Sequence, residues 1–236
     1  MNESEGAALL LSVWMGLSAV GVGLLPATAV ALLLARRSFW GKALVEAAVF
    51  LPLVLPPVVT GYVLLTLFGR ESPVGAALAA LGIEIPFTWT GMALAGAVMG
   101  FPLLVRSMRS GFENVDARLE AAARSLGCSR WEAFFSVTLP LAWPGIVAGA
   151  VLCFARALGE FGATVMLSPG TAGNRTLPLE IFRSYQSPGE EAAVFRLAMI
   201  SILLSAGALA ASEILVRRSR SRRPSAGEES PGEGGR

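Results

Sequence analysis

The sequence is short of the side chains on which most enzymes depend. Its 236 residues include no histidine, one lysine and two cysteines. Histidine is the usual general acid or base near neutral pH and the commonest metal ligand, so its absence argues against both kinds of site. Cys128 and Cys153 lack the paired spacing of a disulfide framework or a zinc site, and we interpret them as structural thiols. We therefore expect no catalytic residue, no metal and no cofactor in this chain.

A nucleotide-binding loop is also missing. Lys42 follows Gly41, but Arg36 occupies the position where a G-x-x-x-x-G-K loop requires glycine. That glycine lets the backbone curl around phosphates, and arginine cannot replace it. We therefore expect any ATP to be bound by another subunit.

Charge is scarce as well. Only 15% of the residues are charged and 54% are hydrophobic, which is typical of membrane proteins. Five apolar segments are long enough to cross about 30 Å of hydrocarbon, which takes about 20 helical residues. They run approximately over Ala8–Ala35, Ala47–Phe68, Phe87–Val105, Leu141–Leu167 and Leu197–Val216. We predict an all-α membrane protein with about five transmembrane helices.

The distribution of arginine sets the orientation. Basic residues gather after the first, third and fifth segments, which places those regions in the cytoplasm, the N-terminus outside and the C-terminus inside. The acidic start MNESEG leads into an apolar run too long for a signal-peptide core, so we interpret it as an uncleaved span, although residues 27–29 mimic a cleavage site. We assign residues 1–216 to a membrane domain and 217–236 to a basic anchor with a disordered cytoplasmic tail.

One amphipathic block, residues 113–140, interrupts the apolar segments. Asp116 is suited to cap a helix start, and Gly127 accepts the left-handed conformation common just past a helix end. Ser129 and Glu132 then form the S-x-x-E pattern of a capping box. The block predicts two short cytoplasmic helices joined at a glycine elbow.

The spacing of this block resembles the cytoplasmic loop of ABC importer permeases, which reads E-A-A, three residues, G, nine residues and I-x-L-P. The glycine and proline anchors match, while the glutamate stands one residue early and valine replaces isoleucine. A hairpin lying on the membrane surface would explain the apolar stripe but not this spacing. The resemblance implies docking into a cleft of an ATPase through Glu120, Ala121, Ala122, Ala123, Gly127, Ser129, Trp131, Phe134, Phe135, Leu139 and Pro140.

The second apolar segment contains three prolines that interrupt helical hydrogen bonding, followed by a threonine and a glycine. Within lipid, such a break is tolerated where neighbouring helices or a water-filled path satisfy the freed carbonyls. We therefore regard Pro56, Pro57, Thr60 and Gly61 as candidate pathway residues. A packing kink without a role in transport is the alternative.

The fourth segment carries Arg156 and Glu160 one helical turn apart. At this spacing the two charges can neutralise each other inside the membrane. They form either a structural pair or part of a gate or anion path. Gly162, next to this pair, would permit close approach of another helix.

The segment between the last two spans is expected outside. Turn signals at Pro169, Gly170 and Gly173 precede a short amphipathic stretch at Leu177–Tyr185. Contact with an extracytoplasmic delivery protein and a simple connector on the membrane surface are both consistent with it.

Beyond the loop, most of residues 34–193 resemble the permease subunit of molybdate ABC importers, through LPLVLPPVVTGYVLL, ARALGEFGA and NRTLPLEIF. The resemblance implies a multi-pass inner-membrane permease that imports molybdate, and tungstate with it. It implies a homodimer in membrane lipid, two copies of a cytoplasmic ABC ATPase, an extracytoplasmic molybdate-binding protein and no nucleic acid. A sulfate or thiosulfate permease is the alternative within the class. A membrane-embedded enzyme or scaffold is the rival from another class, and no nucleophile with a base partner favours the enzyme.

Overall fold

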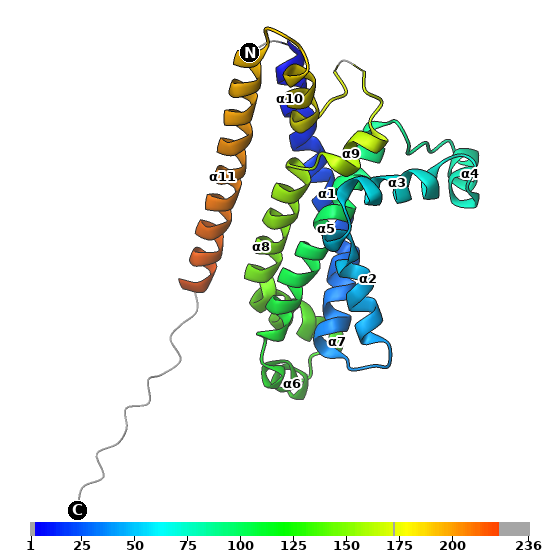
Figure 1. Ribbon diagram of the computed structural model, residues 1–236. Coiled ribbons are helices and arrows are strands. Elements are labelled where there is room, and N and C mark those ends of the chain that lie inside the picture. Colours follow the sequence, from blue (N-terminus) through cyan, green and yellow to red (C-terminus); the bar gives the residue numbers. More distant parts are fainter. Residues whose placement is uncertain (1–2, 172, 222–236) are drawn as a thin grey trace, which may run out of the picture.

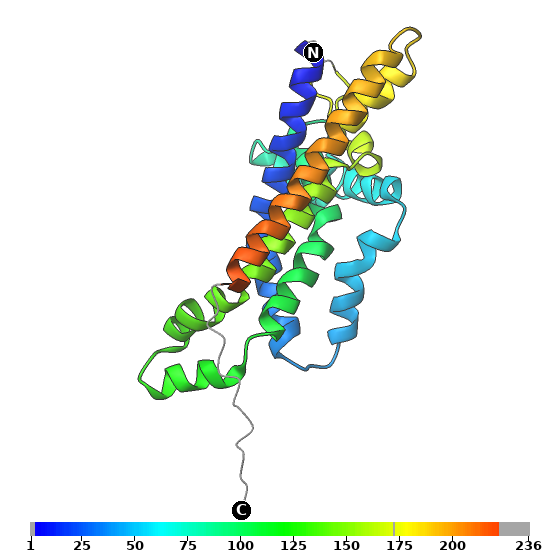
Figure 2. The same cartoon turned by 90° about the vertical axis from the view of Figure 1, so that its left-hand side faces the viewer.

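The computed structural model describes residues 3–171 and 173–221, and the regular structure within them is helical (Figures 1 and 2). The predicted all-helical membrane fold is therefore confirmed. The helices run in the order α1 (Glu3–Arg36), α2 (Lys42–Val54), α3 (Pro57–Phe68), α4 (Pro73–Ala80), α5 (Trp89–Glu113), α6 (Ala117–Ser125), α7 (Arg130–Ala133), a π-helical turn (Phe134–Thr138), α8 (Leu139–Leu158), α9 (Gly162–Leu167), α10 (Leu177–Tyr185) and α11 (Glu191–Ser221).

Four of the described helical stretches are long and apolar enough to cross a membrane. They lie within Glu3–Arg36, Trp89–Glu113, Arg130–Leu158 and Glu191–Ala211, and the bent pair α2 and α3 makes a fifth if it is counted as one span. The third predicted span ended too early, at Val105. The helix α5 continues through the basic residues that follow and ends at Glu113. The N-terminus lies at one end of the bundle, and α6 and α7 lie at the other (Figure 1).

The helices α1, α5 and α8 form the centre of the bundle and share one apolar core. Small residues let α5 and α8 approach closely. A Cβ added at Gly100 would lie 2.6 Å from Sγ of Cys153, and one at Gly145 would lie 2.7 Å from Cα of Gly111. The hydroxyl of Ser107 also donates a hydrogen bond to the carbonyl of Gly145, at 2.9 Å. Cys153 is thus a buried packing residue, as the sequence predicted.

The second predicted span is not a single helix. The helices α2 and α3 meet at an angle of 114°, and α3 runs across the bundle axis toward α4 (Figure 1). Pro57 occupies the first turn of α3, where its missing N–H costs no helical hydrogen bond. Leu55 and Pro56 between the helices take extended conformations, in keeping with the bias that proline imposes on the residue before it.

The fourth predicted span also requires correction, at both ends. Its helix begins at Arg130 rather than near Pro140, since α7, the π-helical turn and α8 run on without interruption. It then ends at Leu158, and a break of three residues separates it from α9. Glu160 therefore lies in that break, whereas the sequence predicted it on a continuous helix with Arg156.

The π-helical turn accommodates a proline. Proline lacks an N–H and clashes with the carbonyl four residues earlier, so Pro140 cannot follow a regular α-helical turn without strain. The turn widens instead, and the backbone N–H of Leu139 donates to the carbonyl of Phe134, five residues back.

The outer part confirms one predicted helix and adds one that was not predicted. The predicted amphipathic stretch is α10, which packs against α1 and α11. The short helix α4 was not predicted, although Ser72 caps it by accepting from the N–H of Gly75 at 2.8 Å. The helix α11 continues to Ser221 and so includes the first residues of the predicted basic anchor, 217–221. The rest of the tail lies outside the described residues.

Candidate functional site

The first half of the cytoplasmic loop is built as its sequence predicts. Asp116 caps α6 by accepting a hydrogen bond from the N–H of Arg118 at 2.8 Å. Gly127 ends the helix with a φ of 99°, a conformation that disfavours any residue with a Cβ. The N–H groups of Gly127 and Cys128 bond to the carbonyls of Arg124 and Ala123, the Schellman pattern that closes a helix end.

The second half restarts at once. The Ser129 hydroxyl accepts from the N–H of Glu132 at 3.2 Å, and the Glu132 carboxylate accepts from the N–H of Ser129 at 2.7 Å. This is the predicted capping box. Because α7 continues through the π-helical turn into α8, the end of the loop and a membrane-spanning helix form one continuous helical stretch.

The loop carries large apolar side chains that are exposed on the protein surface. Leu126 is 87% exposed, Trp131 73% and Phe135 60%. The rings of Trp131 and Phe135 are stacked, with their centroids 6.4 Å apart. A large apolar patch beside charged residues is typical of a surface that another protein covers. Leu126 was not among the residues predicted to dock. Of those that were, the following are also exposed: Ala121, Ala122, Gly127, Ser129 and Pro140. Ala123 and Leu139 are half-buried.

Two of the predicted docking residues instead face the chain itself. The carboxylate of Glu120 lies 3.4 Å from the guanidinium of Arg36 at the end of α1, and it accepts a hydrogen bond from the buried Thr138 hydroxyl at 3.1 Å. Phe134 is half-buried against Phe112 of α5, with ring centroids 6.5 Å apart. The loop is thus fastened to three spanning helices.

The candidate pathway residues form a second cluster, where α3 crosses α9. A Cβ added at Gly61 would lie 2.8 Å from Cα and from the carbonyl oxygen of Ala163. One added at Gly162 would lie 2.7 Å from Cβ of Pro57. The two glycines therefore allow backbone contact at this crossing, as predicted for Gly162. Pro56 lies exposed at the bend.

Glu160 determines where α9 begins. Its side chain is 1% exposed, forms an ion pair with Arg156, and accepts a hydrogen bond from the N–H of Ala163 at 2.8 Å. The predicted neutralisation of the two charges is confirmed. The sequence did not predict that the same carboxylate would also satisfy an N–H group of α9, which a helix start leaves unpaired.

A cluster of ion pairs lies at the outer end of the bundle, and the sequence did not predict that these charges would pair. Glu180, buried in α10, contacts Arg175 at 3.4 Å and Arg183 at 2.9 Å, and Arg183 reaches Glu190 at 2.8 Å. Hydrogen bonds from Ser184 and then from Arg183 lower the pKa of Glu190 below its ordinary value. The sequence placed these charges outside but carried no signal for their pairing. Together they join α10 to the segments on either side of it, from Arg175 to Glu190 just before α11.

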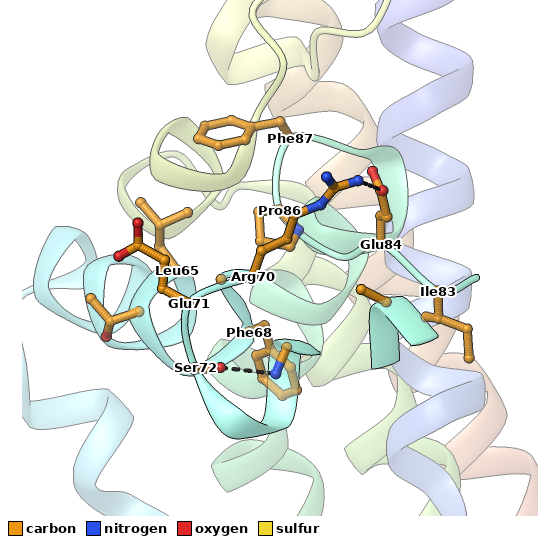
Figure 3. A pocket seen from close by; sticks show the side chains of 13 residues that line it. Leu65, Phe68, Arg70, Glu71, Ser72, Ile83, Glu84, Pro86 and Phe87 are labelled. Atoms are coloured by element: carbon orange, nitrogen blue, oxygen red, sulfur yellow. Dashed lines mark hydrogen bonds and ion pairs between the residues drawn. The ribbon is translucent and has the colours of Figure 1, made fainter. Parts of the chain in front are cut away.

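An open cavity of about 650 Å³ lies beside α3 and α4 (Figure 3). Arg70 and Glu84 form an ion pair at its rim, and Phe87 extends over it with a φ of 59°, a conformation unusual for an aromatic residue. This cavity belongs to the arm that α3 and α4 extend away from the bundle (Figure 1).

These features define a multi-pass membrane protein with an exposed apolar loop at one end and two of its spans broken at one crossing. The chain belongs to the family described as binding-protein-dependent transport system inner membrane components, whose model matches residues 19–221.

Relatives of known description agree. The molybdenum transport system permease protein ModB of Escherichia coli is 47% identical over 224 residues, covering 94% of this chain and 98% of that protein. ModB of Haemophilus influenzae is 46% identical, covering 91% and 94%. The structure is also similar to that of the methionine ABC transporter MetNI in inward-facing conformations, with a TM-score of 0.64, 20% identity and coverage of 93% and 99%. At that identity the likeness supports the fold alone.

Proposed function

We propose that this chain is the permease of an ATP-driven molybdate importer, and that tungstate, a tetrahedral oxyanion of nearly the same size, follows the same path. The observation that carries the proposal is the 47% identity to a molybdenum permease over 94% of this chain. The exposed loop supports the same conclusion, because an apolar cytoplasmic patch is what a docked ATPase would cover.

The mechanism begins at the loop. ATP binding and hydrolysis in the partner subunit move α6 and α7. Because α7 continues into α8, and Glu120 fastens α6 to α1 and to the start of α8, these elements move together. The motion reaches Glu160, and through its bond to Ala163 it reaches α9. The crossing of α9 with α3 then parts or closes, which alternates access between the two sides.

The assembly we propose is a homodimer with two copies of the ATPase and an outer binding protein. The helices α2 and α3 leave large apolar side chains exposed, which lipid or a second copy of the chain can cover. Val54 is 81% exposed, Leu44 72% and Tyr62 57%. The outer binding protein would deliver the oxyanion at the outer end of the bundle, near α10 and its ion-pair cluster.

Uptake into vesicles tests the proposal. The reconstituted complex, with its ATPase and candidate binding proteins, should accumulate molybdate and tungstate when ATP is supplied to the cytoplasmic side. Sulfate is the informative competitor, because the probable sulfate transport system permease protein cysT of Chlorella vulgaris is 40% identical over 69% of this chain and 61% of its own length. ATP-driven uptake of sulfate without molybdate would establish the sulfate alternative. Turnover of a substrate by the isolated chain would contradict both.

A further inference from the structure

One hydroxyl at the α3 and α9 crossing has no bonding partner. Thr60 is 6% exposed, and its Oγ1 forms no hydrogen bond with any described residue. Buried polar groups are nearly always paired, so an orphan hydroxyl calls for an explanation. A second threonine nearby shows the usual solution, since Thr164 of α9 is fully buried and donates to the carbonyl of Glu160 at 2.8 Å.

The position of Thr60 explains why it is covered. It shares the buried face of α3 with Gly61 and Leu64, and this face packs against α9 and α5. At Gly61, the residue next to Thr60, the backbone of α9 lies in direct contact with α3. Any movement that parts α3 from α9 uncovers this face, and with it the hydroxyl.

The electrostatics of the crossing are compatible with an anion. Thr60 stands in the first turn of α3, a helix of 12 residues, where the partial charge of a helix is positive. The nearby carboxylate of Glu160 is paired with Arg156 and bonded to Ala163, so its charge is compensated. A hydroxyl beside such a helix start can donate a hydrogen bond to an oxyanion without a basic side chain.

We propose that Thr60 is a substrate-contacting residue, whose hydroxyl donates to the tetrahedral oxyanion when α3 and α9 part. The inference rests on the proposed transport function and names a contact within it. In the closed crossing the hydroxyl is unpaired, which raises the free energy of that state. In the parted crossing the oxyanion supplies the acceptor. Thr60 thereby favours the separation of α3 from α9 and stabilises a bound ligand that has acceptor oxygens.

Substitutions test the contact. Thr60→Val keeps the shape of the side chain and removes the donor, and it should lower the maximal rate of molybdate uptake at least about tenfold, the loss expected for a hydrogen bond to a charged group. Thr60→Ser keeps the donor and should retain uptake. Thr28→Val on α1 is the matched control, because that hydroxyl donates to the carbonyl of Leu24 within its own helix and lies away from the crossing. It should leave uptake within about twofold of the unmodified transporter, as expected for a bond of no consequence to the ligand. Unchanged uptake in Thr60→Val, in a transporter that imports molybdate, would overturn the contact and leave the transport function standing.

Thiol labelling decides the matter independently of uptake. In a background of Cys128→Ser and Cys153→Ala, the variant Thr60→Cys in the full complex should react with a negatively charged methanethiosulfonate in only one nucleotide state. Molybdate or tungstate should slow that reaction, while Thr28→Cys, packed against Met108 away from the crossing, should stay unreactive. Failure of Thr60→Cys to react in every nucleotide state, or reaction without protection by any of molybdate, tungstate and sulfate, would refute the proposal. This holds even if uptake shows the proposed substrate to be wrong.

Discussion

The carboxylate of Glu120 lies 3.4 Å from the guanidinium of Arg36, although 83 intervening residues separate the two in the sequence. The same carboxylate accepts a hydrogen bond from the hydroxyl of Thr138, at 3.1 Å. One side chain thus joins α6 to the end of α1 and to the start of α8. The neighbouring Ala121, in the position where the importer pattern has glutamate, faces outward.

Removing this link should uncouple the loop from the membrane helices. We expect Glu120→Ala to hydrolyse ATP in the full complex at a near-normal rate while uptake falls several-fold, because α6 can then move without α1 and α8. Parallel ATPase and uptake assays measure the ratio. Arg124→Ala, on the exposed side of the same helix, is the control and should leave the ratio unchanged. If Glu120→Ala lowers ATPase activity and uptake in equal proportion, Glu120 instead contacts the ATPase.

The glycine elbow provides a second prediction. Gly127→Ala places a Cβ at a φ of 99° with no atom within 4 Å, so its cost is conformational strain rather than a clash. We expect a loss of about 1 kcal/mol in stability and a marked loss of coupled uptake. Gly41→Ala has the same kind of strain outside the loop, with a φ of 92° and no neighbour within 4 Å. Equal uptake by the two variants in vesicles would show that the elbow is not part of the coupling path.

A third prediction concerns the crossing. Gly61→Ala introduces a methyl group 2.8 Å from the Ala163 backbone, which cannot move aside as a flexible side chain would. We expect α3 and α9 to be forced apart, with an ATP-independent leak of oxyanion from loaded vesicles. Gly21→Ala on α1 meets nothing within 4 Å and should not leak. A tight membrane in both variants would place the barrier elsewhere.

Glu160 and Arg156 give a fourth prediction. Glu160→Gln keeps an acceptor for the N–H of Ala163 but deprives Arg156 of its counter-ion, so we expect about 3 kcal/mol of destabilisation. The double variant Arg156→Gln with Glu160→Gln should recover part of that loss, since no unpaired charge is left. Thermal unfolding in detergent measures both. A double variant less stable than Glu160→Gln would show that Arg156 has a stabilising role apart from this pair.

Local signals predicted the parts of the site that local chemistry builds. Asp116, Gly127 and the capping box of Ser129 and Glu132 act within a few residues, and each occurs where the sequence placed it. The inward contact of Glu120 could not be predicted in this way, because its partner Arg36 is distant in the sequence. The size of the bend between α2 and α3 was also unpredictable, since proline breaks a helix without fixing its new direction.

The sequence by itself determined that this chain is a helical membrane protein of the importer class, because apolar length, arginine placement and loop spacing are properties of consecutive residues. Only the tertiary structure decided which charges distant in the sequence are paired, that Glu160 lies in a break and starts a new helix, and that α3 crosses α9 over an unpaired hydroxyl. These features depend on which side chains meet across helices. That is settled by packing of the whole chain, in which Gly61 and Gly162 allow two backbones to touch.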